Sequence, residues 1–214
     1  MKYKLAIFDL DGTVLDTAKD ISSAVNYVLK KYGFPQVDMD HVLHNTGYAS
    51  RYLLEHSVPE GTDVDALYPE YTAYYNAHSN DTSSPYPGIT GVLEKLKACG
   101  LRLALVSNKP EPAVITLMDQ HFPGIFECTI GDKDGQRKKP YPDSVNRALA
   151  LLGEERENCV YIGDSEVDVL TAKNAGMPCI SVKWGFRSEK ELIDAGASLI
   201  VSSPEELYDA ITGD

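Results

Sequence analysis

Short apolar segments that alternate with helical patterns constrain the fold of this chain more than any other feature of its sequence. Five such segments, each short enough to be a buried strand, lie at residues 5–8, 101–106, 126–130, 160–162 and 179–182. From residue 88 onward, the apolar residues between them recur at the i, i+3, i+4, i+7 spacing of an amphipathic helix. Strands that alternate with helices form βαβ units, so we predict an α/β fold with a doubly wound, Rossmann-like parallel sheet.

Residues 16–86 interrupt this alternation. Helical patterns recur there at 21–32, 39–45, 48–57 and 69–78, and no convincing strand separates them. We therefore predict that residues 1–15 and 87–214 form a core domain and that residues 16–86 form an inserted helical cap domain. The turn-rich segment 80–88 should form a two-stranded hinge with Asp16 and Thr17. Nine of the 13 tyrosines lie in the insertion, which suits either a lid over a site or a small tyrosine-rich core.

The charge of the chain argues against nucleic acids and membranes as partners. Its 214 residues include 20 Lys and Arg against 32 Asp and Glu, a net charge of −12, which repels phosphate backbones and anionic lipid surfaces. The longest basic run, at residues 137–139, is too short to form a basic patch. With no apolar stretch of about 18 residues and no export signal at its start, the chain is expected to be cytoplasmic.

Asp9 and Asp11 follow directly on the first apolar segment, and Gly12 allows the backbone to turn sharply after them. With one residue between them, the two carboxylates can share one side of the turn. One can then attack as a nucleophile while the other moves a proton. On its own, this pattern is equally typical of a plain metal site or a cap.

Three more of the apolar segments end at residues that suit phosphate and Mg²⁺. Ser107 and Asn108 follow the second segment and can hold an oxyanion, and Lys139 follows the third and can neutralise phosphate charge. Asp164 follows the fourth and offers the carboxylate oxygens that Mg²⁺ prefers. Asp168, one turn later, orients the surroundings of Asp164, pairs with Lys139 or complements a helix dipole. Because ligands of open α/β sheets bind outside the carboxyl ends of strands, we expect these residues to converge on one site.

The motifs that carry this chemistry are D-x-D-G-T at residues 9–13, S-N at 107–108, K-P at 139–140 and G-D-S-x-x-D at 163–168. In this order, and over its whole length, the chain resembles the haloacid dehalogenase superfamily of phosphohydrolases. Segments 85–88, 106–109, 139–143, 161–165 and 184–187 look like its phosphoglycolate phosphatase branch. The resemblance implies strand order 5-4-1-2-3, a helical cap after the first strand and a Mg²⁺-dependent hydrolase of a small phosphorylated metabolite, with 2-phosphoglycolate as the expected substrate. It leaves open whether the protein is a monomer or a homodimer.

The same resemblance implies a role for each site residue. Asp9 would be the nucleophile that forms an aspartyl phosphate, and Asp11 would protonate the leaving alcohol and then activate water. Ser107 and Lys139, helped by Asn108, would bind the transferring phosphoryl group. The implied Mg²⁺ ligands are Asp9, Asp164 and the backbone carbonyl of Asp11, and the implied outer shell consists of Thr13 and Asp168.

Substrate specificity is expected to lie in the cap, where closure excludes water. The cap is acidic, so a substrate carboxylate would need a local cation, and Arg51 in the segment 47–51 is the best candidate. The backbone amides that begin at Gly47, at the start of the same helical pattern, are the other option. The alternative interpretation of Arg51, an ordinary surface arginine on a short helix, is slightly favoured.

Three other functions fit part of the pattern. A β-phosphoglucomutase-like phosphotransferase shares the motifs and the cap, but such mutases differ from this chain where it has Thr13, Ile21 and Ser50. A pyrophosphatase of the same superfamily needs only phosphate-binding groups in the cap and stays open. A signalling receiver domain normally carries its phosphorylated Asp on the third strand and has no helical insertion, so it fits poorly.

Overall fold

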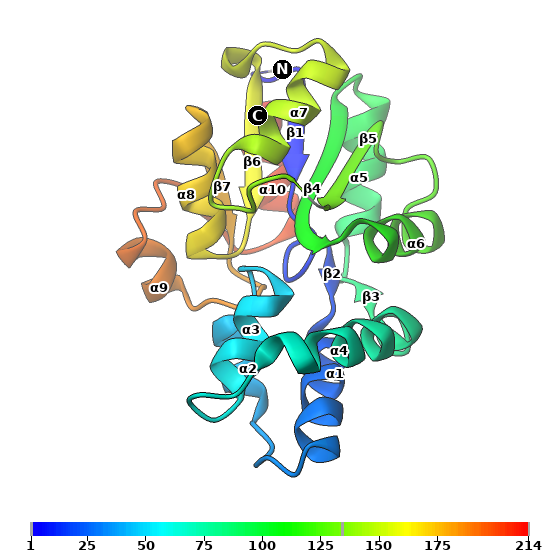
Figure 1. Ribbon diagram of the computed structural model, residues 1–214. Helices are drawn as coiled ribbons and strands as arrows, with labels where there is room; N and C mark the ends of the chain where they lie inside the picture. Colours follow the sequence, from blue (N-terminus) through cyan, green and yellow to red (C-terminus); the bar gives the residue numbers. More distant parts are fainter. Residues whose placement is uncertain (1, 134, 214) are drawn as a thin grey trace.

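A six-stranded parallel sheet forms the centre of the computed structural model, which describes residues 2–133 and 135–213 (Figure 1). The strands lie in the order β5-β4-β1-β6-β7-β8. Their bounds are β1 Leu5–Phe8, β4 Arg102–Pro110, β5 Cys128–Asp132, β6 Cys159–Gly163, β7 Cys179–Val182 and β8 Ile200–Val201. The predicted α/β class is confirmed, and the five predicted strands lie in the expected order, with β8 added at one edge.

Strand β1 is buried on both faces of the sheet, which explains why it reads as a continuous apolar run. Ala6 and Phe8 belong to one hydrophobic cluster, and Leu5 and Ile7 belong to a second cluster on the opposite face. The first cluster also contains residues of α5 (Ile89–Ala98), α6 (Glu111–His121) and α10 (Pro204–Thr212). The second contains residues of α7 (Asp143–Leu152) and α8 (Glu166–Ala175). Helices therefore cover both faces, as a doubly wound sheet requires.

Four helices between residues 18 and 78 pack around a hydrophobic cluster of their own (Figure 1). They are α1 Ala18–Lys31, α2 Met39–Asn45, α3 Ser50–Ser57 and α4 Val64–His78. Strands β2 (Leu15–Asp16) and β3 (Ser84–Pro85) form an antiparallel pair at the two ends of this segment. The pair lies where the sequence predicts the hinge, and the exact domain division at residues 16 and 86 stays a prediction.

A buried carboxylate joins α1 to the segment that returns from the helices to the sheet. Asp20 accepts hydrogen bonds of 2.6–3.1 Å from the backbone N–H and the hydroxyl of both Thr82 and Ser83. Burial alone would raise the pKa of Asp20, but these hydrogen bonds outweigh it and lower the pKa. The carboxylate therefore stabilises one particular path of the chain through the hinge.

The remaining elements differ from the sequence prediction at their ends. Strand β4 continues to Pro110 instead of ending at residue 106, and β5 starts at Cys128 rather than 126. Helix α4 begins five residues before the predicted start because the Asp63 side chain caps it by accepting from the N–H of Asp65. The short elements α9 (Glu189–Asp194) and a 3₁₀ turn, Arg156–Asn158, complete the fold. No helix in residues 2–133 and 135–213 is long and apolar enough to cross a membrane.

Candidate active site

A small cavity of about 30 Å³ lies between the carboxyl ends of the central strands and the helices of residues 18–78, the predicted cap. This is room for roughly two water molecules. Its cap side is formed by the loop at residues 46–48 together with α1, α3 and α4. Its core side is formed by Asp9, Asp11, Ser107, Asn108 and Lys109.

Asp9, immediately after β1, is part of a buried chain of charges. The ammonium of Lys139 lies 2.7 Å from Oδ1 of Asp9 and 2.8 Å from Oδ1 of Asp168, and it also contacts the Tyr161 hydroxyl at 3.1 Å. Burial alone would lower the pKa of Lys139, but the charges of Asp168 and Asp9 raise it well above its usual range. Lys139 is therefore a cation in direct contact with the Asp9 carboxyl group.

Asp164, after β6, lies next to this chain of charges. Its Oδ1 accepts from the hydroxyl of Thr13 at 3.1 Å, and its Oδ2 accepts from the backbone N–H of Phe186 at 2.7 Å. Gly12 (φ +84°) passes so close that a Cβ there would lie 2.3 Å from Oδ2 of Asp164. Burial, followed by the charge of Asp168, raises the pKa of Asp164 to about 7.

Asp9, Asp164 and Asp168 bring three carboxylate oxygens within 4.8 Å of one another. When all three carboxyl groups are ionised, the single positive charge of Lys139 leaves an excess of two negative charges. Burial, with the neighbouring acids adding to it, raises the pKa of Asp9 well above its usual range despite Lys139. Buried carboxylate oxygens with an excess of two negative charges fit a hard divalent cation such as Mg²⁺.

Within this trio, Asp168 makes so many contacts that it suits an outer position. Its Oδ2 accepts from the backbone N–H of Asp164 and from both the N–H and the hydroxyl of Ser165, at 2.7–3.2 Å. Its Oδ1 contacts Lys139 and accepts from Tyr161. Asp168 also completes a capping box at the start of α8. It therefore makes two of the expected contacts at once, the ion pair with Lys139 and the contact with the start of the helix.

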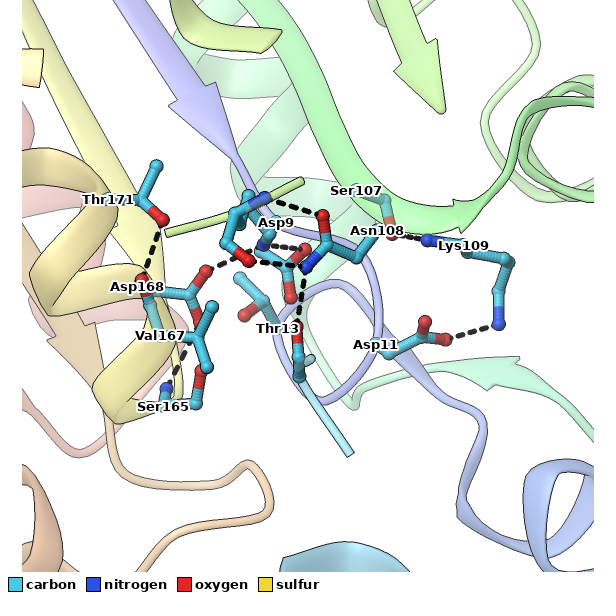
Figure 2. A network of polar contacts seen from close by, with 12 residues as sticks. Asp9, Asp11, Thr13, Ser107, Asn108, Lys109, Ser165, Val167, Asp168 and Thr171 are labelled. Atoms are coloured by element: carbon cyan, nitrogen blue, oxygen red, sulfur yellow. Dashed lines mark hydrogen bonds and ion pairs between the residues drawn. The ribbon is translucent and has the colours of Figure 1, made fainter. Parts of the chain in front are cut away.

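Ser107 and Asn108 lie near the end of β4, on the core side of the cavity (Figure 2). The Asn108 amide N–H₂ donates to the carbonyls of Gly47 (3.1 Å) and Lys139 (3.0 Å), while its oxygen accepts from the N–H of Lys139 (2.8 Å). Asn108 therefore fixes the loop that carries Lys139. The Ser107 hydroxyl accepts from the N–H of Lys109 at 3.1 Å, which leaves its own proton available for an anion in the cavity.

Comparison with known proteins identifies the family. Residues 6–182 match the family model of haloacid dehalogenase-like hydrolases. The chain belongs to this family. It is 35% identical over 188 residues to a phosphoglycolate phosphatase of Aquifex aeolicus, covering 86% of each protein. A phosphoglycolate phosphatase 1 of Pseudomonas aeruginosa is 30% identical, with 95% of this chain and 78% of the relative covered.

Among solved structures, a candidate phosphoglycolate phosphatase from Lactobacillus delbrueckii subsp. bulgaricus superposes with a TM-score of 0.93 at 38% identity, covering all of both chains. These likenesses confirm the predicted family and the predicted enzyme class, a phosphatase among the haloacid dehalogenase-like hydrolases.

Core side chains in this hydrolase donate to backbone carbonyls of residues 43–47. Gly47 reaches the cavity, and its carbonyl accepts from Asn108. Buried Arg187, in the loop after β7, donates to the carbonyls of Leu43, His44 and Thr46 at 2.5–2.9 Å. Arg187 also pairs with Glu166 at 2.7 Å. A core arginine thus satisfies the carbonyl groups at the end of α2.

The structure does not bring Arg51 to the cavity. Its guanidinium contacts Glu55 at 2.9 Å, one helical turn along α3, and also pairs with Asp65 at the start of α4. Both partners are cap residues that lie in solvent, so Arg51 connects two cap helices on the outside of the domain. The surface interpretation of Arg51 therefore describes its position.

No role for Lys109 is expected from the sequence, although this residue lies within the segment 106–109. Lys109 is buried, and its ammonium lies 2.7 Å from Oδ1 of Asp11 (Figure 2). It also donates to the hydroxyl of Tyr75. Thr17 donates to the same oxygen of Asp11 at 2.6 Å. Because β4 continues to Pro110, Lys109 lies at the carboxyl end of this strand. The sequence prediction ends the strand at residue 106, so it does not place Lys109 beside the site.

Proposed function

We propose that this hydrolase is a Mg²⁺-dependent phosphatase that cleaves a small phosphomonoester, with 2-phosphoglycolate as the substrate, through an aspartyl-phosphate intermediate. The observation that carries the proposal is the placement of Asp9 and Asp11, which line one cavity while a buried lysine contacts each of them. The names of the relatives support the choice of substrate. We further propose that residues 1–15 and 87–214 form the catalytic core and that residues 16–86 act as a cap over the site.

In the first chemical step, a carboxylate oxygen of Asp9 attacks phosphorus and the bond to the ester oxygen breaks. Asp11 gives its proton to that leaving oxygen, so a neutral alcohol departs. In the second step, water attacks the phosphorus of the aspartyl phosphate while Asp11 takes a proton from the water. The acyl phosphate bond breaks, phosphate leaves, and both carboxyl groups return to their starting states.

Each neighbouring contact supports one part of this cycle. Thr17 and Lys109 both contact Oδ1 of Asp11, which orients the carboxyl group and leaves Oδ2 for proton transfer. Ser107 and Lys139 would hold the phosphoryl oxygens, with Asn108 fixing the Lys139 loop. Asp9, Asp164 and the Asp11 carbonyl would bind Mg²⁺, whose charge offsets the repulsion between a phosphate dianion and the attacking carboxylate. Thr13 and Asp168 would keep the metal ligands in place.

Phosphate release at neutral pH, with Mg²⁺ and with EDTA, tests this function. The panel contains 2-phosphoglycolate, pyrophosphate, β-glucose 1-phosphate and several sugar and nucleotide phosphates. We expect preferential hydrolysis of 2-phosphoglycolate that EDTA abolishes. Asp9→Asn should abolish turnover with the fold intact, whereas the matched change Asp119→Asn, at an exposed position of α6, should leave the rate unchanged.

The other outcomes separate the rival functions. Preference for pyrophosphate would replace the proposed substrate, and conversion of β-glucose 1-phosphate to an isomeric phosphate without release would indicate a phosphotransferase. Near-normal activity of Asp9→Asn would refute the aspartyl-phosphate mechanism. No release from any ester with Mg²⁺ present would refute the phosphatase assignment of the site.

A further inference from the structure

Lys109 is a buried cation that the proposed reaction uses only indirectly. Its side chain is 2% exposed, its ammonium contacts Asp11 and Tyr75, and it lies 4.7 Å from the centre of the Tyr75 ring. Burying a lysine is costly unless partners compensate for the lost hydration. A position this costly suggests that the charge does more than orient a neighbouring carboxylate.

Among the described residues that line the cavity, Lys109 is the single cation. The cap side of the lining is uncharged and includes Gly47, Ser50, Tyr71 and Tyr75. Arg51 is paired outside the cavity. A ligand that carries an acidic group in addition to its phosphate therefore has one partner for it, the ammonium of Lys109.

The hydrogen-bonding capacity of this ammonium is not exhausted. A protonated lysine has three N–H donors. Among the described residues, two contacts of the Lys109 ammonium are with polar oxygens, Oδ1 of Asp11 and the hydroxyl of Tyr75. One donor thus remains for a ligand oxygen in the cavity.

The position of Lys109 also sets the length of the ligand. Lys139 contacts Asp9 and Lys109 contacts Asp11, two residues along the same turn after β1. A phosphoryl group at Asp9 and an anionic group at Lys109 must therefore belong to a molecule with only a few bonds between them.

We propose that Lys109 recognises a carboxylate on the substrate and so selects short phosphorylated carboxylic acids, with Tyr75 holding the ammonium in place. This inference rests on the proposed function, because it assumes that the phosphoryl group binds at Asp9. The sequence predicts Arg51 as the residue that determines specificity. The structure instead favours Lys109, near the end of β4.

The test compares two ligands that differ only in the acidic group. 2-Phosphoglycolate and ethylene glycol monophosphate have the same length, but a neutral hydroxymethyl group replaces the carboxylate in the second. Calorimetry with an Asp9→Asn protein measures binding of both in the presence of Mg²⁺ without turnover. Lys109→Gln in that background should weaken 2-phosphoglycolate binding by about 10- to 100-fold and change binding of the neutral ester by less than about twofold.

The same comparison in the active enzyme uses kcat/KM for the two esters. Lys109→Gln should remove the preference for 2-phosphoglycolate, while Lys109→Arg, which keeps the charge, should retain most of it and shows that the position tolerates change. Arg51→Gln should leave the preference intact. Circular dichroism and the midpoint of thermal unfolding establish that each variant is folded.

Two results would overturn the proposal. An equal loss for both esters in Lys109→Gln would mean that Lys109 only positions Asp11. A loss of preference in Arg51→Gln, with none in Lys109→Gln, would place carboxylate recognition in the cap. If the wild-type enzyme hydrolyses no ester, the proposed function fails, and the calorimetric comparison still decides whether Lys109 binds the carboxylate.

Discussion

Removing divalent cations should make this hydrolase less stable as pH rises, and Asp164 gives the size of the effect. Burial and the neighbouring Asp168 raise the pKa of Asp164 from 3.8 to about 7. The folded protein therefore favours the protonated form. Below about pH 4, folded and unfolded chains are both protonated and the stabilisation is complete. Above that, the unfolded chain gains free energy by releasing the proton, so stability falls until about pH 7.

The magnitude follows from the shift. One pKa unit corresponds to about 1.4 kcal/mol, so a rise of about three units removes about 4 kcal/mol of the free energy of unfolding across this window. That is a large part of the typical total of about 5–15 kcal/mol. Mg²⁺ bound to the ionised carboxylate would reverse the trend, because it stabilises the charged form that the metal-free protein disfavours.

Urea unfolding in EDTA and in excess Mg²⁺, at several values between about pH 5 and pH 7, measures both effects. Asp164→Asn is the matched control, because it keeps the shape of the side chain and removes the titration. The difference in pH slope between wild type and variant isolates Asp164 from Asp9, whose raised pKa acts in the same direction. Identical slopes in EDTA, or a Mg²⁺ stabilisation that does not grow with pH, would refute the reasoning.

Three further predictions concern the framework of the site. Asp20→Asn should lower the free energy of unfolding by about 2–4 kcal/mol in urea, because the charge-assisted hydrogen bonds to the hinge are lost. Arg187→Met should lower the free energy of unfolding by about 2 kcal/mol. The loss stays this small because Glu166, which would lose its partner, is partly exposed to solvent. The same substitution should speed amide hydrogen exchange in α2, because the carbonyl groups at the end of this helix lose their donor. Unchanged exchange would argue against the contact between Arg187 and α2. Gly12→Ala should abolish Mg²⁺ binding measured by calorimetry, because the added Cβ would lie 2.3 Å from Oδ2 of Asp164.

The sequence predicts the strands that are buried on both faces and misses those that are not. The run at 5–8 is apolar throughout, the run at 179–182 is apolar except for Ser181, and both appear as strands with the same bounds. β8 has two residues at the sheet edge, too few for any periodicity. β4 was predicted too short because its last four residues include Ser107, Asn108 and Lys109, which are polar yet buried by the site. Pattern reasoning treats such residues as a loop.

The same division holds for the site. Asp9, Ser107, Lys139 and Asp164 were predicted to converge because each follows an apolar run, and parallel strands bring their carboxyl ends to one edge. Arg51 was chosen by charge and position in the cap alone. Its spacing of four from Glu55 indicates a helical ion pair, but its contact with Asp65 depends on how α3 and α4 pack, which spacing cannot give.

The buried cations explain how an acidic chain can hold an anionic substrate. Although the protein carries a net charge of −12, the side chains of Lys109, Lys139 and Arg187 are each 2% exposed and each contacts a carboxylate. Burial keeps water from screening these charges. A ligand anion then shares a cation with a protein carboxylate rather than meeting it in solvent. Asp11→Glu lengthens the carboxylate that contacts Lys109. The change should therefore weaken anion binding as well as proton transfer, because the longer side chain would fill the space around the remaining N–H donor of Lys109.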